Sequence, residues 1–143
     1  FGVNLIMNAL SGRPYTKRDR PYALTQSAQQ AQTDGQINGS RLPWQVTFDA
    51  RINKSFILTK DGKRSLDVYF QIFNLFNQKN IIDVYPYTGS PNDDGFLASQ
   101  QGQTQIARQV SAQSFIDLYN QQLNNPFNYS LPRRVRLGVA YNF

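Results

Sequence analysis

Apolar and polar residues alternate with a period of two in four segments of the chain, residues 2–10, 44–56, 65–76 and 134–143. The clearest alternation begins at Trp44, where every second residue as far as Ile52 is apolar. A period of two puts successive side chains on opposite faces of a strand, whereas on a helix it would scatter apolar groups around the circumference. The pattern predicts four β-strands, each with one apolar and one polar face.

The links between these segments differ greatly in length. Residues 59–64 form a short link that contains Asp61 and Gly62, a pair that favours a tight hairpin turn. Residues 11–43 and 77–132 are much longer. Within the second long link we expect a turn at residues 90–95.

A helix is also expected in the second long link, over residues 104–123, with Thr104 as its cap. We expect one side of this helix to pack against other parts of the protein. Its apolar residues are Ile106, Val110, Phe115, Leu118 and Tyr119.

Strand length and link length together favour a barrel in a membrane. Strands of nine to eleven residues, rising ~3.3 Å per residue and tilted by ~40°, span an apolar layer of ~25 Å. Four strands cannot close a barrel, and open sheet edges do not occur in lipid. Short turns alternating with long loops are typical of outer-membrane barrels, whose short turns are periplasmic. We therefore expect an all-β fold of antiparallel transmembrane strands, with residues 11–43 and 77–132 extracellular and residues 59–64 periplasmic.

Composition narrows the possible chemistry. The 143 residues include no Cys and no His. Disulfides, zinc fingers, thiol nucleophiles and histidine-dependent catalysis are therefore excluded. No apolar run is long enough for a transmembrane helix. We expect neither an enzyme nor a bound cofactor, and a chain that begins at Phe1 without a signal peptide is expected to be processed or a fragment.

The net charge of +6 raises the question of nucleic acid binding. Arg134 and Arg136 alternate with apolar residues, and no aromatic platform with interleaved basic residues accompanies them. Nucleic acid is therefore not an expected partner. The alternation instead predicts a lumen-facing set of side chains, namely Asp49, Arg51, Asp67, Tyr69, Gln71, Arg134 and Arg136.

Carboxylates offer two further possibilities. Asn92, Asp93 and Asp94 have side-chain oxygens of the kind that calcium prefers as ligands. A calcium loop needs more ligands at set spacing, so we expect an ordinary turn and no metal. Asp49 and Asp67 lie on neighbouring predicted strands. Acid–base catalysis by this pair is less favoured than hydrogen bonding to Arg51 or other groups of the wall.

The aromatic residues of the second long link allow two interpretations, which the sequence leaves open. Tyr85, Tyr87 and Phe96 either stack on a ligand or pack the loop against itself or a partner. The candidate ligand or partner loop consists of Tyr85, Tyr87, Asp93, Asp94 and Phe96.

Several short motifs, in order along nearly the whole chain, are similar to those of one family. They include a run of the form N-L-F-N-x-x-N at residues 74–80 and a last strand that ends in Tyr141 and Phe143. The further motifs are S-G-R-P-Y-T at residues 11–16, L-P-W at 42–44, V-Y at 84–85, T-G-S-P at 88–91 and P-R-R at 132–134. Together they resemble TonB-dependent outer-membrane receptors of the SusC-like, carboxypeptidase-regulatory-like branch.

This resemblance implies that the chain forms the last four strands of a 22-stranded barrel in the bacterial outer membrane. It implies import of a nutrient, such as a glycan, a peptide or a metal chelate. Val139, Tyr141 and Phe143 would be the barrel-assembly signal. The implied partners are outer-membrane lipid, the barrel-assembly machinery, a surface lipoprotein, and TonB through a plug and contact segment that lie outside these residues.

Three alternatives remain open. The chain is a barrel component of a larger outer-membrane assembly, a subunit of an oligomeric barrel with four strands per chain, or a β domain that binds sugar or protein. The last of these predicts that Trp44, Val46 and Phe48 pack against a second sheet, for which the chain has too few strands.

Overall fold

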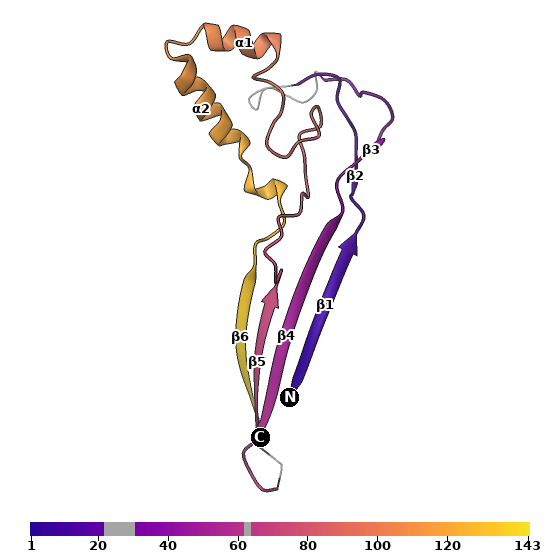
Figure 1. Cartoon of the computed structure of the whole chain (residues 1–143), viewed down its shortest axis with the longest axis vertical. Coiled ribbons are helices and arrows are strands. Elements are labelled where there is room, and N and C mark those ends of the chain that lie inside the picture. The colour runs from indigo at the N-terminus through magenta and orange to yellow at the C-terminus, as the bar shows by residue number, and fades with distance from the viewer. Residues whose placement is uncertain (22–30, 62–63) are drawn as a thin grey trace. The chain divides into compact units, whose positions relative to one another are not determined.

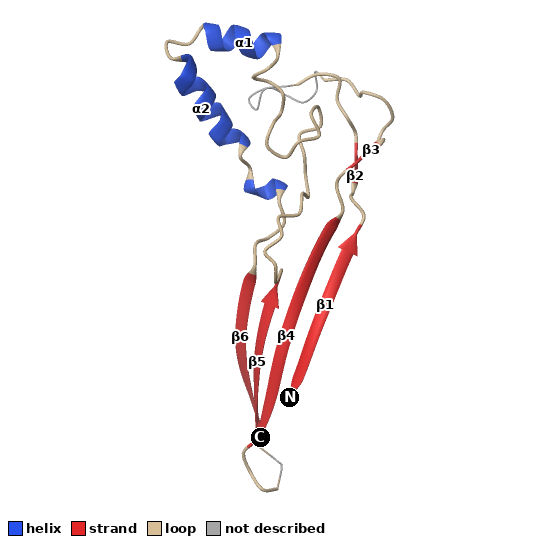
Figure 2. Ribbon diagram, in the orientation of Figure 1, coloured by secondary structure: helices blue, strands red, loops and turns tan. Residues whose placement is uncertain are grey.

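The computed structural model describes residues 1–21, 31–61 and 64–143. These residues divide into two compact units. The sheet unit comprises residues 1–10, 45–80 and 131–143, and the loop unit comprises residues 11–44 and 81–130. The long strands, red in Figure 2, belong to the sheet unit, and the α-helices, blue in Figure 2, belong to the loop unit.

The sheet unit is a single antiparallel sheet in which strands that follow one another in the unit are neighbours (Figure 1). Its order is β1 (Gly2–Leu10), β4 (Gln45–Ile57), β5 (Ser65–Phe73) and β6 (Arg134–Asn142). All four predicted strands are present. The largest difference is at β5, which ends at Phe73 instead of continuing to residue 76.

The pairing register separates the sheet into an apolar and a polar face. Ile72 of β5 lies opposite Ala50 of β4 and Val135 of β6, and side chains alternate along each strand, so each such row shares one face. The apolar face carries one charged side chain, that of Lys54. Its other residues are Val3, Leu5, Met7, Ala9, Val46, Phe48, Ala50, Ile52, Phe56, Leu66, Val68, Phe70, Ile72, Val135, Leu137, Val139 and Tyr141.

No residue of the four strands is buried. The side chain of Leu137 is 68% exposed and that of Val3 is 66% exposed. A sheet with one hydrophobic face normally buries it against a second layer. Among the described residues, this sheet unit has no such layer and therefore no hydrophobic core of its own.

The loop unit, in contrast, has a core. Phe96, Tyr119 and Leu123 are buried together, and the rings of Phe96 and Tyr119 stack with their centres 5.4 Å apart. Tyr85, Leu97 and Phe115 pack around these three residues. Two of the core residues belong to α2 (Ala112–Leu123).

The remaining elements of the loop unit are short. A two-residue ladder joins β2 (Pro14–Tyr15) to β3 (Ser40–Arg41), and α1 (Gln100–Ala107) precedes α2. A 3-10 turn, η2 (Pro126–Asn128), follows α2. Neither of the two α-helices is long and apolar enough to cross a membrane, within the residues that the structure describes.

The expected single helix over residues 104–123 is wrong, because the chain forms two helices with a break between them. Each helix has its own serine cap: Ser99 Oγ accepts the Gly102 N–H, and Ser111 Oγ accepts the Ser114 N–H. Thr104 is not a cap and lies inside α1.

The break also changes the apolar side of the expected helix. Val110 was expected to rest on neighbouring groups, but it lies between α1 and α2 with its side chain fully exposed. Phe115 and Tyr119, which follow the second cap, do pack into the core of the loop unit.

The short link between β4 and β5 is closed by a hydrogen bond from the Leu58 N–H to the Arg64 carbonyl, 2.9 Å long. The predicted tight turn depends on Gly62, which lies outside the described residues.

Candidate functional site: a two-faced sheet and a folded loop unit

The polar face of the sheet brings together all of the side chains that were expected to face a lumen. Gln71 of β5 pairs with Arg51 of β4 on one side and with Arg136 of β6 on the other, forming a row across three strands. The residues that share this face by register and alternation are Asp49, Arg51, Asp67, Tyr69, Gln71, Arg134 and Arg136. The structure confirms that they share a face, while the lumen remains a prediction.

The three arginines of this face lie over aromatic rings. Arg51 Cζ is 4.7 Å from the centre of the Tyr69 ring. Arg134 Cζ and Arg136 Cζ are 5.4 Å and 5.7 Å from the centre of the Phe73 ring. These are cation–π distances, at which the negative face of the ring attracts the guanidinium.

The two carboxylates of the polar face are held by neutral donors. Asp49 Oδ1 accepts the backbone N–H of Asn74 at 2.9 Å. Asp67 Oδ2 accepts from the Asn142 side-chain amide at 2.8 Å. Both carboxylates therefore bond to other groups of the sheet unit, one of the two expected outcomes, and not to Arg51.

Gly138 of β6 leaves room for the Tyr69 ring, which is opposite it in the register. A Cβ atom on Gly138 would lie 2.1 Å from Tyr69 Cζ. The absence of a side chain at this position lets the ring lie flat across the neighbouring strand, within reach of Arg51.

The N-L-F-N-x-x-N motif forms a hydrogen-bonded turn at the end of β5. Asn74 is buried and has a φ of 54°, a left-handed conformation that asparagine tolerates better than most residues. Its side-chain amide donates to the carbonyls of Gln78 at 2.9 Å and Leu131 at 3.1 Å, and its Oδ1 accepts the Gln78 N–H at 2.9 Å. The left-handed turn explains why β5 stops at Phe73.

The other two asparagines of the motif connect this turn to the neighbouring strands. Asn77 Oδ1 accepts the Arg133 N–H at 2.9 Å, just before β6 begins. Asn80 bonds to the backbone of Val46 in β4. The motif thus ties together the ends of three strands, a role that the sequence pattern alone did not reveal.

The three residues of the expected assembly signal lie at the end of the chain and are exposed. Val139 and Tyr141 are on the apolar face, and Phe143 follows β6 with 96% of its side chain exposed. The rings of Tyr141 and Phe143 stack with centres 5.9 Å apart.

The candidate ligand loop is largely occupied with packing. Phe96 has no exposed surface, and Asp94 is buried beside it, accepting the Tyr119 hydroxyl at 2.6 Å and the Phe96 N–H at 2.9 Å. Of the two interpretations left open for Phe96, packing of the loop against itself is the one that the structure supports, and the buried Asp94 side chain is likewise not presented to a ligand. Both belong to the core of the loop unit.

The other members of that candidate loop differ in exposure. Tyr85 is half-buried, and its hydroxyl donates to the Leu123 carbonyl at 3.0 Å. Tyr87 is also half-buried and packs against Gly95, while Asp93 is exposed and accepts the Gly95 N–H at 2.7 Å. Asp93 thus belongs to an ordinary turn, as expected.

The two long links fold together, which the sequence did not predict. Arg13 Nη2 donates to the Ile82 carbonyl at 2.8 Å, and the Arg18 N–H donates to the Pro86 carbonyl at 3.1 Å. The S-G-R-P-Y-T and L-P-W motifs also meet, because the Leu42 N–H donates to the Arg13 carbonyl at 3.0 Å.

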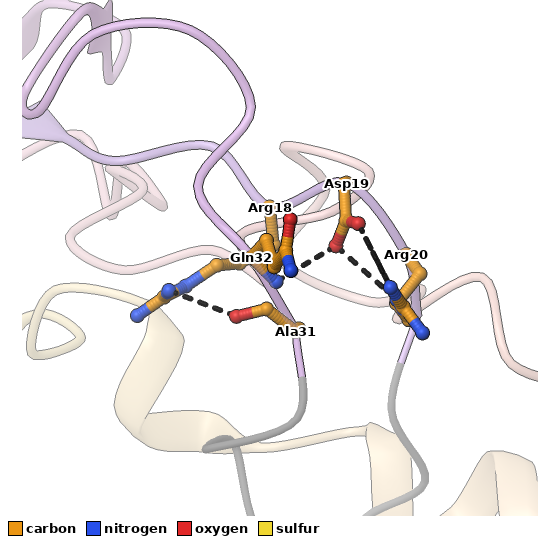
Figure 3. Close-up of polar contacts among 5 residues, drawn as sticks. All are labelled: Arg18, Asp19, Arg20, Ala31 and Gln32. Atoms are coloured by element: carbon orange, nitrogen blue, oxygen red, sulfur yellow. Dashed lines mark hydrogen bonds and ion pairs between the residues drawn. The ribbon is translucent and has the colours of Figure 1, made fainter.

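A polar cluster in the first link, drawn in Figure 3, surrounds Asp19. Asp19 Oδ1 accepts the Gln32 N–H at 2.9 Å, and the carboxylate also pairs with Arg20 at 3.2 Å. Hydrogen bonds from Arg20 first, and then from Gln32, lower the pKa of Asp19 below its ordinary value of 3.8. Arg18 donates to the Ala31 carbonyl at 3.1 Å in the same cluster.

The described residues contain no group of three acidic side chains that would hold a metal ion. Their ion pairs are Lys17 with Asp34 and Arg20 with Asp19, both in the loop unit. The arginines of the polar face therefore have no carboxylate partner among the residues that the structure describes.

Comparison with known proteins gives one informative similarity. The chain is 31% identical over 116 residues to the TonB-dependent transporter Oar of Myxococcus xanthus, a match that covers 73% of this chain. The chain spans 11% of the length of that protein. No protein-family profile matches the chain, and no solved structure matches it. The similarity supports the relationship to TonB-dependent receptors that the motifs indicated.

Proposed function

We propose that this chain is part of the barrel wall of a TonB-dependent outer-membrane receptor. The observation that carries the proposal is a single-layered antiparallel sheet with one continuous, exposed apolar face and one polar face. In this proposal β1, β4, β5 and β6 are the last four strands of a 22-stranded barrel, and the receptor is of the SusC-like branch.

The apolar face suits the hydrocarbon layer of a membrane. Lipid contact would remove groups such as Leu137 and Val139 from water, and each fully buried aliphatic side chain contributes about 1.5–3 kcal/mol. The nine residues of β6, at ~3.3 Å per residue and with a tilt of ~40°, are close to the length that such a layer requires.

The free edges of the sheet suit a barrel as well. β1 and β6 each pair on one side only, so the outer backbone groups of both strands need further partners. Unpaired backbone groups are not tolerated in lipid. Neighbouring strands of a larger barrel would pair with both edges.

The end of the apolar face near the short link resembles a membrane boundary. Phe56, Leu66 and Tyr141 form one row across three strands, and Lys54 Nζ lies 4.8 Å from the centre of the Phe56 ring. Aromatic rings and the long side chain of lysine are suited to such a boundary. We place this end at the periplasmic side and the loop unit at the extracellular side.

In the whole receptor, this wall would contribute to the import of a nutrient such as a glycan, a peptide or a metal chelate. The plug and the TonB contact would come from other parts of the polypeptide. Val139, Tyr141 and Phe143 would be recognised by the barrel-assembly machinery. Exposed groups of the loop unit, such as Asp93, would meet ligand or a surface lipoprotein, and we assign the chain no catalytic step.

An oligomeric barrel with four strands per chain, or a place in a larger outer-membrane assembly, would also pair both sheet edges. The similarity to a TonB-dependent transporter favours the receptor. Denaturing mass spectrometry of the polypeptide from its native source distinguishes the receptor from the oligomeric barrel. A mass several-fold above 16.4 kDa supports the receptor, and a mass equal to it supports the oligomer.

The test of the membrane wall uses single cysteines in the full-length protein, since this chain contains none of its own. Any cysteines elsewhere in the polypeptide are replaced first. Leu137→Cys and Val139→Cys probe the apolar face, and Arg136→Cys and Ala140→Cys probe the polar face. In isolated outer membranes, a water-soluble maleimide should label the two cysteines of the polar face and leave the two cysteines of the apolar face unlabelled. A lipid-dissolved maleimide should show the opposite preference.

Equal labelling of both pairs by the water-soluble reagent would contradict the proposal. Asp93→Cys, in an exposed turn of the loop unit, is the positive control for reagent access. Detergent-solubilised and unfolded protein should label at all of these positions, which controls for the reactivity of each thiol.

A further inference from the structure

The polar face of the sheet holds its positive and negative groups apart. Asp49 and Asp67 accept from neutral amides and form no ion pair with the arginines among the described residues. Arg51, Arg134 and Arg136 contact rings, and none of the three guanidiniums donates a hydrogen bond within the described residues. Each guanidinium carries five N–H donors, and rings use only its flat face.

The register places the three arginines around Gln71 on one face of the sheet. Arg51 and Arg136 flank Gln71 in one row, so their Cα atoms are two strand spacings apart, about 10 Å. Arg134 is two residues from Arg136 on the same face and shares the Phe73 ring with it. Arg51 lies over Tyr69, two residues before Gln71, and the other two arginines lie over Phe73, two residues after it. A solute with two anionic groups would bridge these positions across the Gln71 amide.

Charge in this part of the chain is not balanced. The sheet unit contains nine of the fifteen basic residues and only three of the nine aspartates. The loop unit contains six of each and is neutral. The whole formal charge of +6 therefore belongs to the sheet unit. The polar face itself carries Arg51, Arg134 and Arg136 together with Asp49 and Asp67, an excess of one positive charge. A positive excess raises the local concentration of anions.

We propose that Arg51, Arg134 and Arg136, with Gln71, form a binding patch for a small solute that carries two or more carboxylate or phosphate groups. The rings of Tyr69 and Phe73 hold the guanidinium planes and leave their N–H edges free for the oxyanions. Forked donation to an oxyanion is the geometry that arginine favours. The inference deepens the proposed function, on which it rests, by naming a class of solute that the wall would contact.

Isothermal titration calorimetry of the full-length protein in nonionic detergent, at low ionic strength, tests the patch. Citrate and inorganic pyrophosphate are the probes, and glucose is the uncharged control. We expect both anions to bind and glucose to give no heat. The double variant Arg51→Gln/Arg136→Gln should weaken anion binding by about tenfold or more, because it removes two charged donors.

Two further variants separate the patch from general charge effects. Lys79→Gln/Arg108→Gln removes two exposed positive charges elsewhere on the chain, and it should change the affinity less than about twofold. Arg51→Lys/Arg136→Lys keeps the charge but loses the fork, so we expect an intermediate affinity. The proposal is overturned if Arg51→Gln/Arg136→Gln and Lys79→Gln/Arg108→Gln weaken anion binding to the same extent.

The proposal is also overturned if wild-type protein binds neither anion. An acidic segment of the same polypeptide that fills the patch would produce this result, and Arg51→Gln/Arg136→Gln would then lower the denaturation temperature instead. The cysteine labelling of the two sheet faces is independent of anions. A protein that passes the labelling test and binds no anion would refute this inference while the membrane wall stands.

Discussion

The side chain of Asn80 hydrogen-bonds to both backbone groups of Val46: its Oδ1 accepts the N–H at 3.0 Å, and its Nδ2 donates to the carbonyl oxygen at 2.8 Å. On its other side, Val46 pairs with Ala9 of β1. The ladder between β4 and β5 begins only at Ala50 and Ile72, so a side-chain amide replaces a neighbouring strand at this part of β4. Asn80 therefore satisfies backbone groups that would otherwise need another partner.

Replacing Asn80 with alanine should destabilise the sheet unit by about 1–3 kcal/mol, because both backbone groups of Val46 lose a partner. Asn80→Asp should also destabilise it, since a carboxylate oxygen would then face the Val46 carbonyl. The measurement is the midpoint of urea unfolding in detergent. Lys79→Ala, at an exposed neighbouring position, is the control, and an equal shift in both alanine variants would contradict the expectation.

Asn74 combines a left-handed backbone with three side-chain hydrogen bonds. Asn74→Ala should therefore cost about 2–4 kcal/mol of unfolding free energy, from lost bonds and from backbone strain together. Asn74→Gly loses the same bonds but tolerates the positive φ, so it should be more stable than the alanine variant by about 1 kcal/mol. If Asn74→Ala were more stable than Asn74→Gly, the left-handed backbone at residue 74 would not explain the need for asparagine.

Gly138→Ala should destabilise the sheet by about 1–3 kcal/mol, because the added Cβ collides with the Tyr69 ring. In a Tyr69→Ala background the same substitution should be nearly neutral. Gly2→Ala is the matched control on the same face, since its Cβ would meet only the flexible end of the Asn53 side chain. A double-mutant cycle from unfolding curves measures the coupling, and additive effects would exclude the collision.

Tyr119→Phe should loosen the loop unit, because the buried Asp94 carboxylate loses a 2.6 Å hydrogen bond. We expect a loss of about 1–3 kcal/mol, seen as faster hydrogen–deuterium exchange in α2. Tyr129→Phe also removes a tyrosine hydrogen bond, to Asn92 Oδ1 at 2.8 Å, but at an exposed site. It should have a smaller effect, and the reverse order would contradict the role of Asp94.

The Asp19 cluster should respond to acid. Hydrogen bonds from neighbouring groups lower the pKa of Asp19, so the ionised carboxylate stabilises the cluster at pH values above 3.8. This stabilisation is lost as the pH falls through the lowered pKa of Asp19. Exchange protection of the Gln32 amide, corrected for intrinsic rates, should fall over that range. Asp19→Asn should remove the pH dependence, whereas Asp34→Asn should retain it. A dependence that persists in Asp19→Asn would assign it to another group.

Sequence periodicity was sufficient for the strands, because alternation depends only on which face each side chain occupies. Residues 2–10 were predicted correctly although Ile6 and Leu10 are apolar on the polar face. The point where β5 ends was not predictable in this way. Phe76 is in phase with the apolar residues of β5, whereas the chain turns at Asn74, which bonds to residues far along the sequence, such as Leu131.

The loop unit shows the same limit more strongly. Spacing of apolar residues suggested a continuous helix, since no proline interrupts residues 104–123. The local preference of Ser111 for capping starts a second helix instead. Asp94 and Phe96 were placed in a ligand loop because polar and aromatic residues in a long link are common in both exposed and packed turns. Their contacts with Tyr119, from a part of the chain about 25 residues away, place them in the core of the loop unit.

The loop unit buries Phe96, Tyr119 and Leu123 among its own residues, whereas the sheet unit leaves its apolar side chains uncovered. In the proposed receptor, the loop unit would keep its core in water, and the sheet unit would cover its apolar face with lipid. A change of detergent or lipid should therefore alter the stability of the sheet unit, and a change of aqueous buffer should alter the stability of the loop unit. The stabilities of the two units of one chain would then depend on two different solvents.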